Sequence, residues 1–280
     1  MILVTGSSGF IGSALVARLA KSGRECIGID KVDGLSTADF VGFEALVANS
    51  QPSVIVHLGA NCSSQISLRE PQTDFVDNVL GTFNVCEVSR LHGNIPIIFN
   101  SSMKVQPGDD GLIAPYGLSK IVGESYLDLF HKIYGVDSVI NRPSSVYGPG
   151  QNGSTDGGWF TWFIKASIEG LPITLFGDGT QSRDVLYIDD HIELLIDQID
   201  HFDLYSNTIY DFGGGPSNEV SLNELLDVLK YKNLIVAPKL PADVQRLVND
   251  NQEITSVNGW QPSTNWLKGV ELTRDAFVHA

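Results

Sequence analysis

Residues 100 to 120 read NSSMKVQPGDDGLIAPYGLSK and contain three side chains that could act together on a proton. Tyr116 and Lys120 are four residues apart, so on a helix they lie on one face. A free phenol has a pKa of about 10, and a neighbouring ammonium favours its phenolate form. Ser102, at the end of an apolar run, could hold a substrate oxygen across the cleft. The set predicts an acid/base site, whereas the Tyr–Lys pair alone is equally consistent with a solvated helix surface.

A glycine-rich turn follows the first apolar run of the chain. Gly6, Gly9 and Gly12 are three residues apart and open a helix-like segment. Glycines there let the backbone approach a pyrophosphate, whose charge a helix N-terminus favours. The next apolar run ends at Asp30, where a carboxylate can accept from a ribose 2'-hydroxyl. This pattern predicts a dinucleotide site that favours NAD over NADP, and the adjacent Lys31 weakens that preference without reversing it.

The elements that must position these residues alternate along the first half of the chain. Apolar runs such as ILVTG, SVIVHLG and PIIFNSS are separated by helix-like segments. This alternation is typical of a parallel sheet covered on both faces, so we predict an α/β fold with a Rossmann-type doubly wound sheet. We expect an NAD-binding domain over 1–150 plus about 184–215. A smaller, discontinuous C-terminal substrate lobe is expected over about 151–183 and 216–280.

Composition argues against several classes of partner. The 280 residues include 33 acidic and 18 basic side chains, for a net charge of -15, so nucleic acid is not an expected partner. No leader and no run of about eighteen apolar residues is evident, so we expect a cytoplasmic protein without a membrane partner. Three widely spaced cysteines and six scattered histidines predict neither disulfides nor a metal site. An anionic substrate would require local basic residues.

The order of the motifs resembles the extended short-chain dehydrogenase/reductase superfamily and, within it, the NAD-dependent nucleotide-sugar epimerase/dehydratase family. The segments that carry the resemblance, besides Asp30 and Ser102, are TGSSGFIG, HLGA at 57–60, NVLGT at 78–82, YGLSK at 116–120, RPSSVYGPG at 142–150 and FGDGTQSRDVLYIDD at 176–190. The resemblance implies that Tyr116 deprotonates a sugar hydroxyl as hydride passes to tightly bound NAD. It also implies that Lys120 holds the nicotinamide ribose and that Ser102 hydrogen-bonds the substrate.

The same resemblance implies the binding residues. Those expected around NAD are Gly6, Gly9, Phe10, Ile11, Gly12, Asp30, Lys31, Asp39, Phe40, Leu58, Gly59, Ala60, Asn78, Tyr116 and Lys120. Those expected around the substrate are Ser145, Phe176, Arg183 and Arg246, with Arg183 gripping the diphosphate. The aromatic segment WFTWF, which contains Trp159 and Trp162, either flanks the nucleobase or packs in the core.

The chain also departs from the family pattern. Gln106 and Pro107 stand where the family usually has Tyr-Gly, and the interval from Ser102 to Tyr116 is shorter than usual. Ser145 replaces a common asparagine. The dehydratase branch needs an Asp-Glu pair directly after the active-site hydroxyl residue, but Met103 and Lys104 stand there. Dehydration is therefore not expected.

The resemblance makes an NAD-dependent nucleotide-sugar epimerase the leading expectation. Such an enzyme would act at C4 of a nucleotide-diphosphate sugar through a transient keto sugar. One alternative is an NADPH-dependent nucleotide 4-keto-sugar reductase, which the short stretch between Asp30 and Asp39 favours and the carboxylate of Asp30 disfavours. A second is a non-catalytic NAD-binding protein. The resemblance also implies a homodimer that pairs helices around 78–92 and 116–134.

Overall fold

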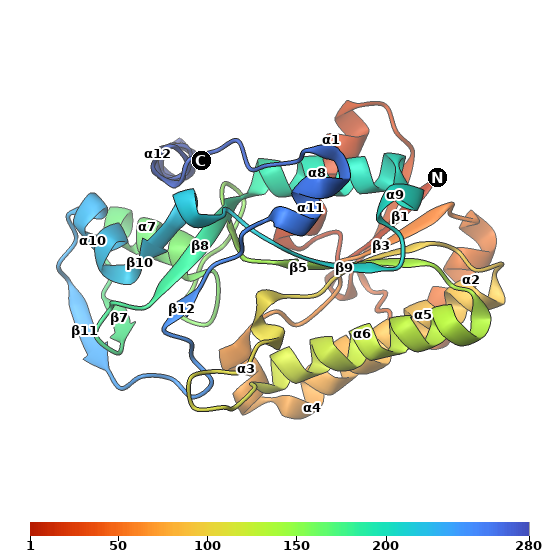
Figure 1. The fold of residues 1–280 in the computed structure, drawn as a ribbon, viewed down its shortest axis with the longest axis horizontal. Helices are drawn as coiled ribbons and strands as arrows, with labels where there is room; N and C mark the ends of the chain where they lie inside the picture. Colours follow the sequence, from red (N-terminus) through yellow and green to blue (C-terminus); the bar gives the residue numbers. More distant parts are fainter. Residues whose placement is uncertain (280) are drawn as a thin grey trace.

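The computed structural model describes residues 1–279 and has a six-stranded parallel sheet at its centre (Figure 1). The strand order is β2-β1-β3-β4-β5-β9. The strands are β1 (Ile2–Thr5), β2 (Cys26–Ile29), β3 (Val54–His57), β4 (Ile97–Asn100), β5 (Ser138–Pro143) and β9 (Thr208–Phe212). Because β2 and β3 lie on opposite sides of β1, the order reverses there and opens a crevice at the carboxyl ends of the strands. The predicted Rossmann-type fold is confirmed.

Helices cover both faces of this sheet (Figure 1). One face carries α1 (Phe10–Lys21) and α8 (Ile188–Asp200), and the other carries α2 (Phe40–Ser50), α5 (Gly81–Leu91) and α6 (Pro115–Tyr134). Within β1, Ile2 and Val4 belong to the core under α1 and α8, whereas Leu3 belongs to the core under α2, α5 and α6. Both faces are buried, which is why the strands are continuously apolar in sequence.

Two smaller sheets lie beside the main one, to the left in Figure 1. In the first, β8 (Ser182–Tyr187) pairs with β6 (Ser145–Tyr147), β10 (Glu219–Ser221) and β12 (Arg246–Leu247). In the second, β7 (Ile173–Phe176) pairs with β11 (Leu234–Ala237). These strands bring segments from both sides of β9 together. The two-lobe boundaries given above remain a prediction.

The remaining elements are further helices and turns. They are the 3-10 turns η1 (Lys31–Asp33), η3 (Met103–Val105) and η4 (Pro216–Asn218), the π-helical turn η2 (Phe75–Leu80), and helices α3 (Ser64–Arg69), α4 (Pro71–Asp74), α7 (Trp159–Glu169), α9 (Phe202–Tyr205), α10 (Leu222–Leu229), α11 (Gln252–Asn258) and α12 (Trp266–Val278). Within residues 1–279 no helix is both long and apolar enough to cross a membrane. The described residues also contain no cluster of three or more potential metal ligands.

His57, at the end of β3, is a structural residue. It is fully buried, and its two ring nitrogens lie 2.7 Å from the Thr5 hydroxyl and 3.1 Å from the Thr82 hydroxyl. Burial, followed by the charge of Lys120, lowers the pKa of His57 to about 3. The neutral ring therefore joins β1 and β3 to α5 directly beneath the crevice.

Candidate active site

The glycine turn after β1 is as closely packed as a phosphate cradle requires. Gly6 has a φ of +69°, and a Cβ atom there would lie 2.7 Å from the backbone nitrogen of Gly59. A Cβ atom on Gly12 would lie 2.0 Å from the carbonyl oxygen of Gly6. Only glycine fits these positions, since real Cβ contacts are never so short. The turn brings the N-terminus of α1 against the loop after β3. Phe10, Ile11, Leu58 and Ala60, which are expected around NAD, therefore lie on two adjoining segments.

At the end of β2, Asp30 presents a half-buried carboxylate beside the glycine turn. Its oxygens accept from the backbone nitrogens of Ser8 and Val32, each at 3.2 Å. The neighbouring ammonium of Lys31 is already engaged, because its Nζ lies 2.6 Å from the Asp77 carboxylate on η2. The cation that weakened the sequence-based preference for NAD is therefore partly neutralised.

Three other residues expected around NAD are Asp39, Phe40 and Asn78. Asp39 caps α2, where one carboxylate oxygen accepts from the backbone nitrogen of Gly42 at 3.2 Å, and Phe40 follows it at the surface. Asn78 ties three segments together, because its amide donates to the Asn61 carbonyl at 3.0 Å and to the Ser119 hydroxyl at 3.0 Å. Cofactor contacts by these residues remain predictions.

Ser102, Tyr116 and Lys120 converge at the carboxyl end of β4. Ser102 caps η3 and its hydroxyl accepts from the backbone nitrogen of Lys104 at 3.1 Å. The first turn of α6 is held by Ser67, whose hydroxyl accepts from the backbone nitrogen of Tyr116 at 3.1 Å. The ammonium of Lys120 donates to the Asn100 carbonyl at 2.7 Å. All three predicted catalytic side chains are buried, at 3% to 8% exposure.

Burial sets the protonation of this trio in the free protein. Burial raises the pKa of Tyr116, and the hydrogen bond with Ser102 opposes part of that rise. Burial lowers the pKa of Lys120 to about 8, against the electrostatic influence of Cys62 and Asp74. The phenol is therefore protonated at neutral pH before a positively charged ring is bound nearby, and the ammonium is close to its titration point.

Both arginines expected at the substrate diphosphate are paired with carboxylates. Arg183 on β8 is only 7% exposed, and its Nη2 lies 2.6 Å from Asp243. Arg246 is more exposed and makes two bonds to Glu219, at 2.8 and 2.9 Å. Arg246 pairs with Ser182, and not with Arg183, in the β8–β12 register. Successive side chains of a strand point to opposite faces, so the two arginines lie on opposite faces of this small sheet.

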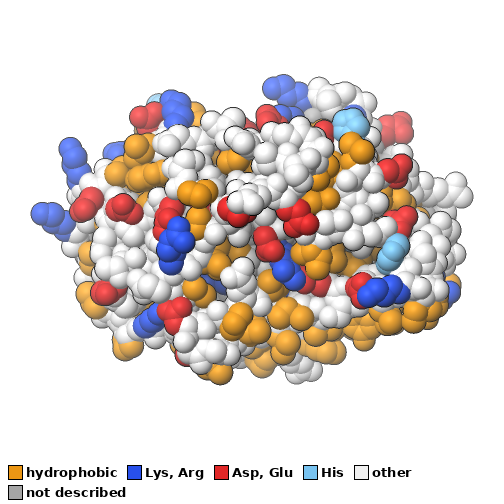
Figure 2. All heavy atoms as spheres, in the orientation of Figure 1, with side chains coloured by type: hydrophobic (Ala, Val, Ile, Leu, Met, Phe, Trp, Pro, Cys, Tyr) orange, Lys and Arg blue, Asp and Glu red, His pale blue; other side chains and the backbone are white. Residues whose placement is uncertain are grey.

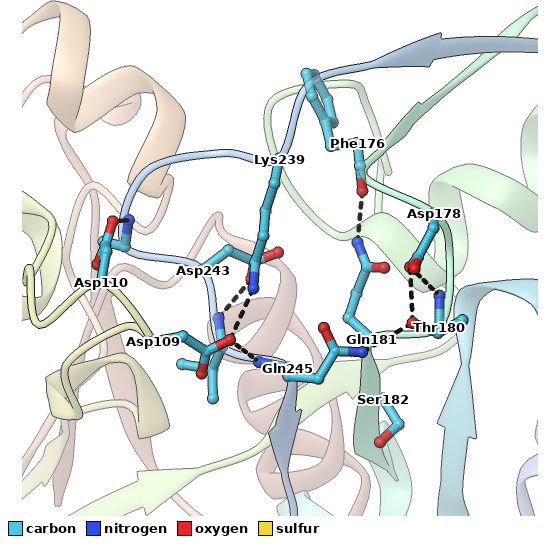
Figure 3. Close-up of polar contacts among 12 residues, drawn as sticks. Asp109, Asp110, Phe176, Asp178, Thr180, Gln181, Ser182, Lys239, Asp243 and Gln245 are labelled. Carbon is cyan, nitrogen blue, oxygen red and sulfur yellow. Dashed lines mark hydrogen bonds and ion pairs between the residues drawn. The ribbon is translucent and has the colours of Figure 1, made fainter.

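Residues 238–245, here called the strap, pass from β11 toward β12 across the short loop of residues 106–114 (Figure 3). The carboxylate of Asp109 accepts from Lys239 Nζ at 2.7 Å and from the backbone nitrogen of Gln245 at 2.9 Å. Asp110 accepts from the backbone nitrogen of Ala242 at 3.0 Å. The shortened loop is therefore fastened to the segment that carries the partner of Arg183.

The remaining candidate substrate residues are Ser145 on β6 and Phe176 on β7. The hydroxyl of Ser145 accepts from the indole of Trp159 at 3.3 Å, and both Trp159 and Trp162 pack against the large core. These contacts favour the packing interpretation of the WFTWF segment. Phe176, at the end of β7, is half-buried, and its carbonyl accepts from the Gln181 side chain (Figure 3).

Sequence reasoning did not identify two residues of this site. In sequence, Lys104 stands where a dehydratase has an acid, which gives it no role in binding. In the structure, its charge lies close to Arg183 and Asp243. Its position two residues after Ser102 was the available signal. Asp243 gave no signal, since its pairing with Arg183 spans 60 residues and depends on how the strap folds.

Comparison with known proteins identifies the family. The model of the NAD dependent epimerase/dehydratase family matches residues 2–213. The chain belongs to this family. A UDP-glucose 4-epimerase of Mycolicibacterium smegmatis is 30% identical over 98% of the chain and 97% of its own length. The members of this family are NAD-dependent enzymes of the extended short-chain dehydrogenase/reductase type, and this chain is one of them.

Two solved structures of this family agree with the fold. UDP-glucose 4-epimerase of Thermotoga maritima, solved with UDP-glucose, is 27% identical, covers 99% of this chain and 98% of its own, and has a TM-score of 0.86. UDP-glucose 4-epimerase of Thermus thermophilus, solved with NAD, is 26% identical, covers 100% and 99%, and has a TM-score of 0.88. The expected cofactor, NAD, is thereby supported for this family member, and the glycine cradle at Gly6 and Gly12 fits its pyrophosphate.

Proposed function

We propose that this protein is an NAD-dependent nucleotide-sugar epimerase that acts at C4 of the sugar. The observation that carries the proposal is the convergence of Ser102, Tyr116 and Lys120 at the crevice that also receives the glycine turn. Acid/base, hydrogen-bonding and cofactor-binding groups then meet at one edge of the sheet, where open α/β sheets bind their ligands. The relatives named UDP-glucose 4-epimerase support the same assignment.

Each member of the trio has a distinct role in the proposed reaction. Tyr116 takes the proton of the sugar hydroxyl and returns it after the keto sugar has turned over. Ser102 holds the same oxygen, and Lys120 keeps the phenolate favourable once the cofactor is in place. The chemistry that NAD supplies when bound is reversible hydride transfer. Because hydride leaves and returns within one cycle, no net redox change occurs.

The ribose end of the site argues against the NADPH-dependent reductase. Besides Asp30, the carboxylate of Asp33 lies here, where it accepts from the hydroxyl of Ser8. Lys31 is paired with Asp77, so two carboxylates face a 2'-phosphate with little positive compensation. Because like charges repel, this arrangement disfavours NADP binding.

A panel of UDP-, GDP-, CDP- and dTDP-sugars in heavy water, with and without NADPH, tests the proposal by NMR. Epimerisation at C4 by hydride return gives an isomer without deuterium on carbon and without added NADPH. Product only with NADPH would establish the reductase instead. No product from any sugar, with NAD bound, would favour a non-catalytic protein.

A matched pair of tyrosine variants on α6 isolates the acid/base role. Tyr116→Phe removes one oxygen and should lower turnover by roughly 100- to 10,000-fold, the usual contribution of general acid–base catalysis. Tyr126→Phe removes the same atom from a ring that packs on Phe83, so its turnover should equal that of the wild type. Equal turnover in both variants would exclude Tyr116 as the proton carrier.

The structure also supports the proposal of a homodimer. On α6, Leu118, Leu129 and Ile133 form an exposed apolar stripe, and Phe75 on η2 is 58% exposed. Apolar side chains gather along the corresponding lower edge of the molecule (Figure 2). A continuous apolar surface of this kind is typical of an interface between subunits. Light scattering on the purified protein should give twice the mass of 30.4 kDa, and Ile133→Glu should shift it to the monomer.

A further inference from the structure

Lys104 lies close to Arg183 and Asp243, at the candidate substrate-binding end of the site. It belongs to η3, two residues after Ser102, and is half-buried. Within residues 1–279 its ammonium makes no hydrogen bond or ion pair, whereas the neighbouring Arg183 and Asp243 are bonded to each other at 2.6 Å. These two charges offset one another. Of these three side chains, Lys104 is the one whose charge has no bonded partner.

A small cavity lies in front of this cation. It has a volume of about 50 Å³, and its lining includes Lys104, Asp243, Gln65 and Ser64. Its outer wall is the strap, at residues 240–242. The backbone of Lys104 also abuts the first turn of α6, since a Cβ atom on Gly117 would lie 2.1 Å from the Lys104 carbonyl oxygen. The side chain consequently starts beside Tyr116 and reaches toward Arg183.

An uncompensated charge held away from water costs free energy unless a ligand neutralises it. The protein has a net charge of -15, so its overall electrostatic field repels anions, and a cation in the substrate cleft opposes that repulsion locally. Burial, and then the charge of Arg183, lowers the pKa of Lys104 to about 8, while Asp243 opposes that shift. An anion at this point would restore full protonation. A side chain that binds an anion through a charge-assisted hydrogen bond needs an ammonium with no other partner in the free protein, as Lys104 has within residues 1–279.

We propose that Lys104 determines substrate specificity by binding an anionic group of the nucleotide sugar, between the reacting hydroxyl at Tyr116 and the diphosphate at Arg183. This proposal rests on the proposed function, because it assumes that a nucleotide sugar occupies the cleft. Two groups of such a substrate have the required chemistry. One is a carboxylate on the sugar ring, as in a hexuronate, and the other is the diphosphate itself.

Equilibrium binding to the NAD-loaded protein distinguishes these groups without requiring turnover. The probes are UDP, UDP-glucose and UDP-glucuronate, titrated by calorimetry into the wild type, Lys104→Met and Lys104→Arg. Loss of one charge-assisted hydrogen bond should weaken binding roughly tenfold to 100-fold in Lys104→Met, and Lys104→Arg should retain most of the affinity. The matched control is Lys132→Met, on the exposed surface of α6, where the lysine is paired with Asp128 at 2.8 Å.

Four results decide the matter. A loss confined to UDP-glucuronate assigns the sugar carboxylate to Lys104, and an equal loss for all three probes assigns the diphosphate. Unchanged binding of every probe by Lys104→Met would overturn the proposal, and so would binding of none by the wild type. If Lys104→Met is poorly folded by circular dichroism, Lys104→Gln is compared with Lys104→Arg in the same way. The failure of the proposed function is recognised separately, as bound UDP-sugar that never epimerises.

Discussion

The carboxylate of Asp30 gives the sharpest test of cofactor choice in this protein. Asp30→Asn preserves the size of the side chain and removes its charge. A carboxylate about 5 Å from a doubly charged 2'-phosphate contributes about 2 kcal/mol of repulsion at the dielectric of water. The dielectric of water is used because Asp30 is only half-buried at the end of β2. Removing the charge should therefore improve NADP binding by about 2 kcal/mol.

The same substitution weakens the binding of NAD. Hydrogen bonds to a charged acceptor contribute about 1.5–3 kcal/mol and those to a neutral one about 0.5–1.5 kcal/mol, so the ribose contact loses about 1 kcal/mol. Together the two effects shift the ratio of NAD to NADP affinity by about 3 kcal/mol, or roughly 100-fold. Calorimetric titration of cofactor-free protein with each dinucleotide at one salt concentration measures this ratio.

The ion pair between Lys31 and Asp77 separates the contributions of the two charges. Lys31 is 55% exposed, and exposed pairs contribute about 0.2–1 kcal/mol, so Asp77→Asn should raise NADP affinity by no more than about fivefold. Asp128→Asn, which breaks a similar pair on α6, should leave both affinities unchanged. Equal affinity of the wild type for NAD and NADP, or an unchanged ratio in Asp30→Asn, would refute the assignment of Asp30 to the ribose.

Two further predictions concern stability and pH. Glu124 is buried and accepts two bonds from Arg142, at 2.6 and 2.9 Å, so Glu124→Ala should cost about 2–3 kcal/mol and lower Tm by about 5 °C in a thermal melt. A shift of less than about 1 °C would contradict this. The pKa of Lys104, beside the Arg183–Asp243 pair, is lowered to about 8, so its charge is present below that pH and lost above it. Affinity for its anionic probe should fall about tenfold per unit above pH 8 in the wild type and stay level in Lys104→Arg; equal profiles by calorimetry would contradict the assignment.

The sequence predicts the fold and the catalytic centre because both depend on local patterns. Continuous apolar strands alternating with helices imply a doubly wound sheet, and the glycine spacing implies the turn between β1 and α1. Side chains four residues apart lie on one face of a helix, so the proximity of Tyr116 and Lys120 requires no tertiary information. The carboxyl end of β4 then brings Ser102 to the same edge.

Only the tertiary structure decides which charges remain free in the cleft. Arg183 reads in sequence as an available cation, yet Asp243 of the strap neutralises it across 60 residues, and Lys31 is paired with Asp77 across 46. Lys104, which stands in sequence where a dehydratase has an acid, makes no ion pair within residues 1–279 although it lies close to Arg183 and Asp243. Coulomb interactions depend on the final separation of side chains from distant segments, and that separation is set by how the loops pack rather than by any periodicity in the chain.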